Sequence, residues 1–289
     1  MLPLKIMTWN VEHFNGRGGK SPDKEPLRKG RLNRIVDFIK DEEPDIFALS
    51  EVTTSLVYTK MVAAFPNHTF HITTGQQSQE ILIGVRPGLG SFFTQKDEFK
   101  RNNIYLRPGA LLTVKDGDLI VPILFVHLKS MPSAEGFGLR DAMYDKIYSL
   151  KKALDKAAKA MPNHQGAAAN FIVLGDYNSM GLDYYRRGND ISGNREIEVL
   201  TRKMNARGMR KPLPSHPFTY NNGSQSDLPL SELDHLFAAE HLEFETSAEG
   251  HEVRVAGWNL KNTAAKQDKW IEKFSDHAPL IATLTGVGS

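Results

Sequence analysis

Eight residues that can bind a metal ion or move a proton lie at the ends of short apolar runs. The clearest run starts at Phe171 and ends in Gly175, Asp176, Tyr177 and Asn178. In an extended strand, side chains i and i+2 point to the same side, so a strand continuing past Gly175 would aim Asp176 and Asn178 together. The alternative is a turn, because Gly, Asp and Asn are all turn formers. The other six residues are Asn10, Glu51, His127, Asp234, Asp276 and His277.

This combination of residue types suggests metal-assisted hydrolysis. Carboxylates and carboxamides suit a hard cation such as Mg²⁺, and histidines titrate near neutral pH. The sequence has no His-Glu-x-x-His, P-loop, Gly-x-Gly-x-x-Gly or Gly-x-Ser-x-Gly motif. Zinc hydrolases of that type, P-loop nucleotide hydrolases, Rossmann enzymes and serine hydrolases are therefore disfavoured.

The elements that must position these residues are many short strands with a few helices between them. Helices are expected from Arg31 to before Pro44 and over 138–160 and 195–206, and Asp116-Gly117 is a hairpin signal. Residues 15–30 predict a loop. No repeat or linker divides the chain, so we expect an α/β fold in a single domain over residues 1–289. The predicted strands are 4–9, 45–50, 70–73, 81–85, 103–106, 110–114, 119–126, 171–174, 233–238 and 279–284.

The bulk composition is that of a globular protein with room for a sizeable core. The chain has 289 residues, 40% hydrophobic and 24% charged, with a net charge of +2 and no cysteine. Disulfides, thiolate zinc sites and cysteine nucleophiles are therefore excluded. No apolar run reaches the roughly 18 residues that span a membrane, and no signal-peptide pattern opens the sequence. A cytoplasmic location is expected, with export as the alternative, and a monomer is the default.

Six short motifs together resemble the endonuclease/exonuclease/phosphatase superfamily, the DNase I-like metal-dependent phosphoesterases. Each motif is weak alone, but all six occur in the family's order and span residues 4 to 285. The resemblance implies a four-layer α/β sandwich of two packed, mostly antiparallel β-sheets flanked by helices. The motifs are Thr8-Trp-Asn10-Val, Ala48-Leu-Ser-Glu51, Val126-His127-Leu, Leu174-Gly-Asp176-Tyr-Asn178, Leu233-Asp234-His-Leu and Ser275-Asp276-His277-Ala-Pro279.

The resemblance also implies a metal site. Glu51 and Asn10 would hold Mg²⁺, with Mn²⁺ or Ca²⁺ as alternatives, and Asn10 would also contact substrate. Asp276 would be a further ligand, and Glu12 matches an acidic ligand that some members use. Asp176 and Asn178 would orient the attacking water and contact the phosphate.

Two carboxylate–histidine couples are implied as well. His277 would pair with Asp234, and His127 with Glu80, so that each carboxylate fixes its histidine's tautomer and raises its pKa. Which histidine is the general acid stays open. Glu80 and Arg107 match the DNase I branch, in which the arginine contacts nucleic-acid phosphates.

Two basic segments suggest a polyanionic substrate. Residues 186–211 hold eight Lys or Arg against three Asp or Glu, a local net charge of +5, which suits phosphate contacts; the alternative is a solvated helix face. The leading hypothesis is a Mg²⁺-dependent, weakly sequence-specific nuclease acting on DNA rather than RNA. The alternatives are a phosphatase or phosphodiesterase for a small or lipid phosphoester, such as a phosphoinositide or sphingomyelin, and a non-catalytic binding module. The basic residues are Arg186, Arg187, Arg195, Arg202, Lys203, Arg207, Arg210 and Lys211, with Arg17, Lys20, Arg28, Lys29 and Arg31 after Asn10.

Overall fold

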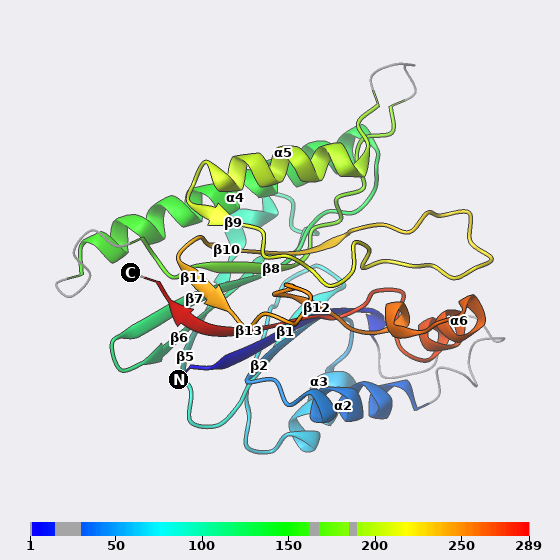
Figure 1. Cartoon of the computed structure of the whole chain (residues 1–289), viewed down its shortest axis with the longest axis horizontal. Helices are drawn as coiled ribbons and strands as arrows, with labels where there is room; N and C mark the ends of the chain where they lie inside the picture. The colour runs from blue at the N-terminus through cyan, green and yellow to red at the C-terminus, as the bar shows by residue number, and fades with distance from the viewer. Residues whose placement is uncertain (1, 15–29, 162–167, 185–189, 289) are drawn as a thin grey trace.

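Two β-sheets pack face to face, with helices on the outer face of each (Figure 1). The structure is a computed structural model that describes residues 2–14, 30–161, 168–184 and 190–288. The first sheet has the order β11-β13-β1-β2-β4-β3, with β12 paired to β13. Its strands are β1 (Leu4–Phe14), β2 (Ile46–Val52), β3 (Thr69–Ile72), β4 (Glu80–Val85), β11 (Leu242–Phe244), β12 (Arg254–Val255) and β13 (Leu280–Val287).

The second sheet has the order β5-β6-β7-β8-β10-β9. Among the strands of the described residues, each sheet has one parallel pair, β1 with β2 and β7 with β8, and the other pairs are antiparallel. The predicted sandwich of two mostly antiparallel sheets is therefore confirmed. The second sheet's strands are β5 (Gly90–Lys96), β6 (Gly109–Asp116), β7 (Leu119–His127), β8 (Ile172–Asp176), β9 (Met209–Arg210) and β10 (Asp234–Ala239).

The helices complete the outer layers. Three of them, α2 (Arg31–Glu42), α3 (Ser55–Ala64) and α6 (Ala264–Lys273), send apolar side chains into the core shared with the first sheet. The long α4 (Ala134–Lys159) and α5 (Gly193–Asn205) cover the second sheet. Two short 3₁₀ helices, η2 (Asp97–Lys100) and η3 (Trp258–Leu260), lie in connections. No helix in the described ranges is both long and apolar enough to cross a bilayer.

The two hydrophobic cores of the molecule follow from the alternation of side chains along a β-strand. In β7, Ile123 and Phe125 belong to the core between the sheets, whereas Leu124 and Val126 belong to the core under α4 and α5. A strand buried on both faces needs apolar residues at every position, because successive side chains point to opposite faces. This explains why the central strands are nearly continuous apolar runs that end abruptly in polar residues.

The structure corrects part of the predicted element map. Residues 103–106 form turns, because the Asn103 side-chain oxygen accepts a hydrogen bond from the Tyr105 N–H (3.0 Å) and competes with strand pairing. The edge strand β5 and the helices α3 and α6 were not predicted. The hairpin at Asp116-Gly117 is confirmed, since Asp116 pairs with Leu119.

Candidate active site

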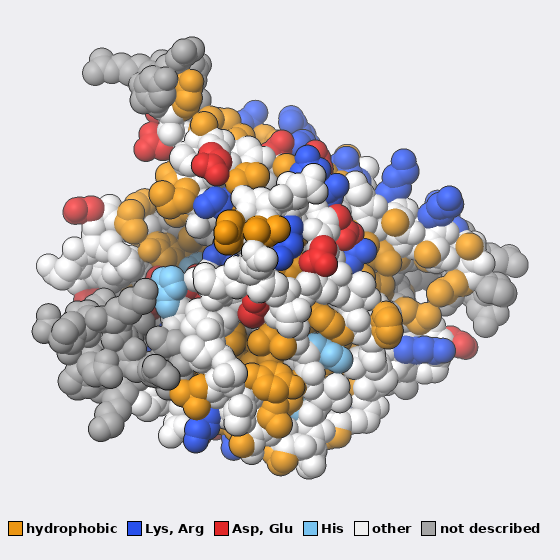
Figure 2. Space-filling model, turned by 180° about the vertical axis from the view of Figure 1, so that it is seen from behind, with side chains coloured by type: hydrophobic (Ala, Val, Ile, Leu, Met, Phe, Trp, Pro, Cys, Tyr) orange, Lys and Arg blue, Asp and Glu red, His pale blue; other side chains and the backbone are white. Residues whose placement is uncertain are grey.

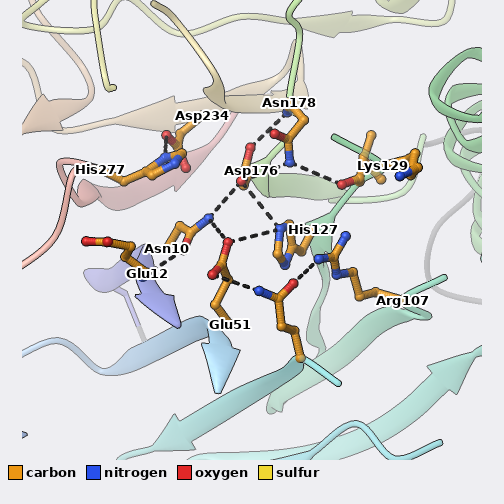
Figure 3. Close-up of polar contacts among 12 residues, drawn as sticks. Asn10, Glu12, Glu51, Arg107, His127, Lys129, Asp176, Asn178, Asp234 and His277 are labelled. Atoms are coloured by element: carbon orange, nitrogen blue, oxygen red, sulfur yellow. Dashed lines mark hydrogen bonds and ion pairs between the residues drawn. The ribbon is translucent and has the colours of Figure 1, made fainter. Parts of the chain in front are cut away.

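Strand register brings the predicted residues to one edge of the sandwich. In the first sheet, parallel pairing of β1 and β2 carries Asn10 and Glu51 to the same edge. In the second sheet, His127 lies opposite Asp176, and Asp176 lies opposite Asp234. Figure 3 shows these strand-end residues together with His277, with side chains of the first sheet reaching those of the second.

Asn10 joins the two sheets. Its side-chain Nδ2 donates to Glu51 Oε1 (3.1 Å) and to Asp176 Oδ2 (2.8 Å). Its Oδ1 accepts the Glu12 backbone N–H at 3.0 Å and keeps a second lone pair. Asn10 therefore fixes the spacing between carboxylates that come from different sheets.

Three carboxylates share the space beside Asn10. The pKa of Asp276 is raised to about 6: removal from water is the largest cause, His277 opposes it, and the charges of Glu12 and Glu51 add to it. Mutual repulsion of this kind means that the carboxylates lie close enough to feel one another's charge. A divalent cation would relieve it.

The donor set fits a hard cation. The side chains of Asn10, Glu12, Glu51 and Asp276 all carry oxygen atoms, the ligand type that Mg²⁺ prefers. Among the described residues, it is a different group, Asp176, Asp234 and His277, that places potential ligand atoms within 4.8 Å of one another. The histidine of this second group is already bonded to one of its carboxylates, Asp234.

His277 is paired with Asp234 as predicted. The His277 Nδ1 lies 2.7 Å from Asp234 Oδ2, and both side chains are buried. The Asp234 backbone N–H donates to Thr219 Oγ1 (2.9 Å), and the Trp9 indole N–H donates to the His277 carbonyl (2.8 Å). The pair therefore has a fixed position, with Nε2 as the ring nitrogen that can face a substrate.

The two histidines have opposite pKa shifts. Burial acts to lower the pKa of His277, but the negative charges of Asp234, Asp176 and Asp276 outweigh it, so the pKa is raised well above its ordinary value. Burial lowers the pKa of His127 well below its ordinary value, and nearby cations, Arg107 first among them, add to this effect. The two shifts favour a proton on His277 and a neutral ring at His127.

The predicted couple between His127 and Glu80 does not form. His127 directs Nε2 toward Asp176 Oδ2 (3.6 Å) and Glu51 Oε1 (3.7 Å), while its Nδ1 is buried with no hydrogen-bond partner among the described residues. Glu80 instead accepts hydrogen bonds from Thr73 Oγ1 (2.6 Å) and Gln77 Nε2 (2.8 Å). These neutral donors lie close to Glu80 on the same hairpin and satisfy its carboxylate there.

Asp176 and Asn178 lie side by side, as their spacing predicted. Asn178 donates to Asp176 through its backbone N–H (2.8 Å) and its Nδ2 (3.0 Å), and Nδ2 also donates to the Leu128 carbonyl (3.1 Å). Burial raises the pKa of Asp176 to about 7; His277 opposes this shift and Asp234 adds to it. The two side chains form one rigid acceptor–donor unit beside the paired histidine.

Gln79 was missed by the sequence analysis. It is buried, donates through Nε2 to Glu51 Oε2 (2.8 Å), and accepts a hydrogen bond from Arg107 through Oε1. Glu51 Oε2 also accepts the His13 backbone N–H at 2.7 Å. Arg107 therefore reaches the site, as predicted, and Gln79 links its charge to Glu51. No composition or spacing signal distinguishes this glutamine from a surface residue.

Backbone strain is concentrated at this edge. Glu12, His13, Glu51 and Asn178 all have positive φ, at 40°, 46°, 64° and 51°. Non-glycine residues in this region cost of order 1 kcal/mol or more each and cluster at functional sites. The geometry of the site is therefore maintained at the expense of local stability.

The described part of the basic segment does not form a rim around the site. The strand β9 pairs with the far end of β10, with Arg210 opposite Ala238 rather than near Asp234. Figure 2 shows Lys and Arg gathered over the outer helical layer of α4 and α5. Arg210 forms two 2.7 Å hydrogen bonds with Glu252, and the Arg207 guanidinium lies 4.2 Å from the Tyr148 ring centroid. The solvated or paired interpretation holds for these residues.

Among the basic residues that follow Asn10 in the sequence, the one in the described part of the chain is also paired within the fold. Arg31 is buried and donates to the backbone carbonyls of Val11, Glu12 and Phe274, so it supports the strand end that carries Glu12. Its interactions are structural. Arg17, Lys20, Arg28, Lys29, Arg186 and Arg187 lie outside the described residues.

One ion pair in this segment predicts acid sensitivity. Glu232 is bonded to Lys211 and lies 3.5 Å from the His235 ring; burial opposes ionisation, but these partners lower its pKa from 4.5 to about 2. A depressed pKa stabilises the fold above pH 4.5, and this stability is lost as the pH falls from 4.5 through 2. The free energy of unfolding of the wild type should therefore fall by up to about 3 kcal/mol more than that of Glu232→Gln across this range. Urea unfolding at several pH values measures it, and parallel curves would contradict the prediction.

The sequence matches the profile of a known protein family. A sequence profile described as the Endonuclease/Exonuclease/phosphatase family matches residues 7–277. The chain therefore belongs to this family of phosphoesterases, whose enzymes generally depend on a divalent metal. No curated protein sequence matches the chain.

Several solved structures share the fold. Truncated TDP2 of Caenorhabditis elegans is 16% identical, with a TM-score of 0.63, and the match covers 99% of this chain and 98% of that one. TDP2 of D. rerio, in complex with a single-strand DNA product, is 14% identical (TM-score 0.61; 99% and 100% covered). A family protein of Bacteroides thetaiotaomicron is 13% identical (TM-score 0.61; 99% and 100% covered). At these identities the likeness establishes the fold.

Proposed function

We propose that the protein is a Mg²⁺-dependent nuclease that hydrolyses DNA phosphodiesters with weak sequence specificity, in one domain over residues 1–289. The observation that carries the proposal is the buried His277–Asp234 pair facing a cluster of carboxylates around Asn10. A binding module has no need for a histidine held protonated beside such a cluster. Family membership supports phosphoester hydrolysis.

The site residues have different roles in the proposed reaction. Asn10, Glu51, Asp276 and Glu12 would hold Mg²⁺, which would neutralise charge on the phosphate oxygens. Asp176 is an acceptor that can orient and deprotonate a water molecule, since its pKa of about 7 lies near the operating pH.

The two histidines take different roles. Protonated His277 can donate a proton to the developing charge or the leaving oxygen, and Asp234 holds the ring in the required orientation. Neutral His127 and Arg107 can donate hydrogen bonds to the phosphate. Both N–H groups of the Asn178 side chain are already used, and its Oδ1 can accept a hydrogen bond from the attacking water. This division follows from the opposite pKa shifts of the two rings.

Support for a nucleic-acid substrate is independent of the chemistry. The guanidinium of Arg107 donates to Gln79 beside Glu51 and Asp176, so its positive charge lies where it can attract a phosphate. One structural neighbour, TDP2 of D. rerio, was solved with a single-strand DNA product.

A substrate panel tests the proposal. Purified protein should nick supercoiled plasmid in the presence of Mg²⁺ and lose this activity in EDTA. The same preparation is assayed on single-strand DNA, RNA, inositol phosphates and sphingomyelin. Phosphate or headgroup release without nicking would refute the nuclease and favour the small or lipid phosphoester, and no hydrolysis with Mg²⁺, Mn²⁺ or Ca²⁺ would refute catalysis.

A further inference from the structure

Behind the site, a buried arginine uses every N–H group of its guanidinium. Arg140, on α4, is fully buried and donates to both oxygens of Glu196 on α5, at 2.9 and 3.0 Å. Its three remaining N–H groups donate to the carbonyls of Lys129 (3.3 Å), Met131 (2.7 Å) and Gly181 (2.7 Å). A guanidinium has five donors in a fixed planar fork, so this arrangement leaves it no freedom to rotate.

The carboxylate of Glu196 also has several hydrogen-bond donors around it. Besides Arg140, its carboxylate accepts the Gly181 backbone N–H (2.7 Å) and the Tyr144 hydroxyl (2.9 Å). Gly181 is therefore held through both its N–H and its carbonyl. Its φ of 78° and the approach of the Ile191 carbonyl, 2.1 Å from where a Cβ would lie, leave no room for another residue.

The bonded carbonyls belong to the two loops that carry the chemistry. Lys129 and Met131 are two and four residues after His127, and Gly181 is three residues after Asn178. The loops are also bonded to each other, because Leu128 donates to the Asp176 carbonyl (2.8 Å) and accepts from Asn178 Nδ2 (3.1 Å). A shift of Arg140 would therefore be transmitted to both loops within a few bonds.

We propose that Arg140 and Glu196 are positioning residues that set the location of His127 relative to Asn178. This inference rests on the proposed function, since it assigns His127 to the phosphate and Asn178 to the attacking water. The pair touches no substrate and acts through the backbone of both loops. Because a misplacement of about 1 Å can cost 100-fold in rate, such a link controls turnover from outside the site.

Arg140→Lys tests the inference, because lysine keeps the charge but loses the planar fork. With bis(p-nitrophenyl) phosphate, kcat should fall about 10–100-fold, with KM changed less than about threefold. In an Asn178→Ala background the same substitution should lower kcat by less than about twofold, because the contact it positions is already gone. Tyr144→Phe, which removes one hydrogen bond to Glu196, provides a milder variant if Arg140→Lys does not fold.

A matched control lies on the same helix. Lys151 is also buried on α4 and contacts both oxygens of Asp155 at 2.6 Å, but it contacts neither catalytic loop. Lys151→Met should lower Tm without changing kcat. An equal loss of kcat in this control, an unchanged kcat in Arg140→Lys, or additive effects with Asn178→Ala would each overturn the inference.

A readout without turnover separates this inference from the proposed function. The NMR signals of the His127 ring and the Asn178 side-chain amide should shift in Arg140→Lys and not in Lys151→Met. Unshifted signals in Arg140→Lys would refute the positioning role. A wild type that hydrolyses nothing while these shifts occur would refute only the proposed function.

Discussion

Replacing His277 with alanine is expected to lower kcat by about 10²–10⁴-fold, the range for loss of an acid–base group. The reason is that Asp234 fixes Nδ1 of His277 at 2.7 Å and its charge raises the pKa of the ring, which favours the protonated form that the proposed reaction uses. Steady-state hydrolysis of a phosphodiester measures the loss. Wild-type turnover in a folded His277→Ala protein would refute the assignment.

The pH dependence of activity tests whether His277 acts as a proton donor. Burial lowers the pKa of His277 and the charge of Asp234 raises it above its ordinary value. If the protonated ring is required, activity is lost as the pH rises through this pKa, and Asp234→Asn should move that alkaline limb to lower pH. His241 serves as the control: it bonds Asn170 (2.9 Å), far from the site, so His241→Ala should retain full activity.

The second large effect is expected at Glu51. Glu51→Gln removes one negative charge from the proposed set of oxygen ligands. The Mg²⁺ concentration for half-maximal activity should therefore rise more than about 100-fold, because loss of a residue that only supports a ligand typically costs 10–100-fold. Calorimetric titration with Mg²⁺ or Mn²⁺ gives the same quantity without turnover.

The exposed carboxylate of Glu243 on β11 is the matched control for charge. Glu243→Gln should bind metal as the wild type does. If Glu51→Gln also binds and uses metal normally, Glu51 does not hold the ion, and the metal site must be built from other residues.

The sequence was most informative where a buried strand ends in a polar residue. Asn10, Glu51, His127, Asp176 and Asp234 were all predicted to meet, and strand register brings them together. A strand end is predictable because continuous apolar residues mark a strand buried on both faces, and the first polar side chain after it must reach a polar space.

Side-chain direction at a strand start was not predictable. Glu80 opens β4, and the alternation of side chains means that Gln79, its neighbour, faces Glu51 while Glu80 faces Thr73. A one-residue difference in register exchanges the two faces, and no pattern in residues 77–80 fixes it. The role of the basic segment was mispredicted for its described residues for a similar reason. The charge content of a sequence does not reveal that Arg210 forms an ion pair with Glu252.

The position of β1 between β2 and β13 has a consequence for how the protein is made. The Trp9 indole bonds a carbonyl 268 residues further along the chain, at His277. During synthesis, the segment carrying Asn10 leaves the ribosome long before its second neighbour strand exists, and β1 must wait with one edge unpaired. The segment that closes this edge also carries His277, so the candidate site is complete only after the last strand of the chain has been made.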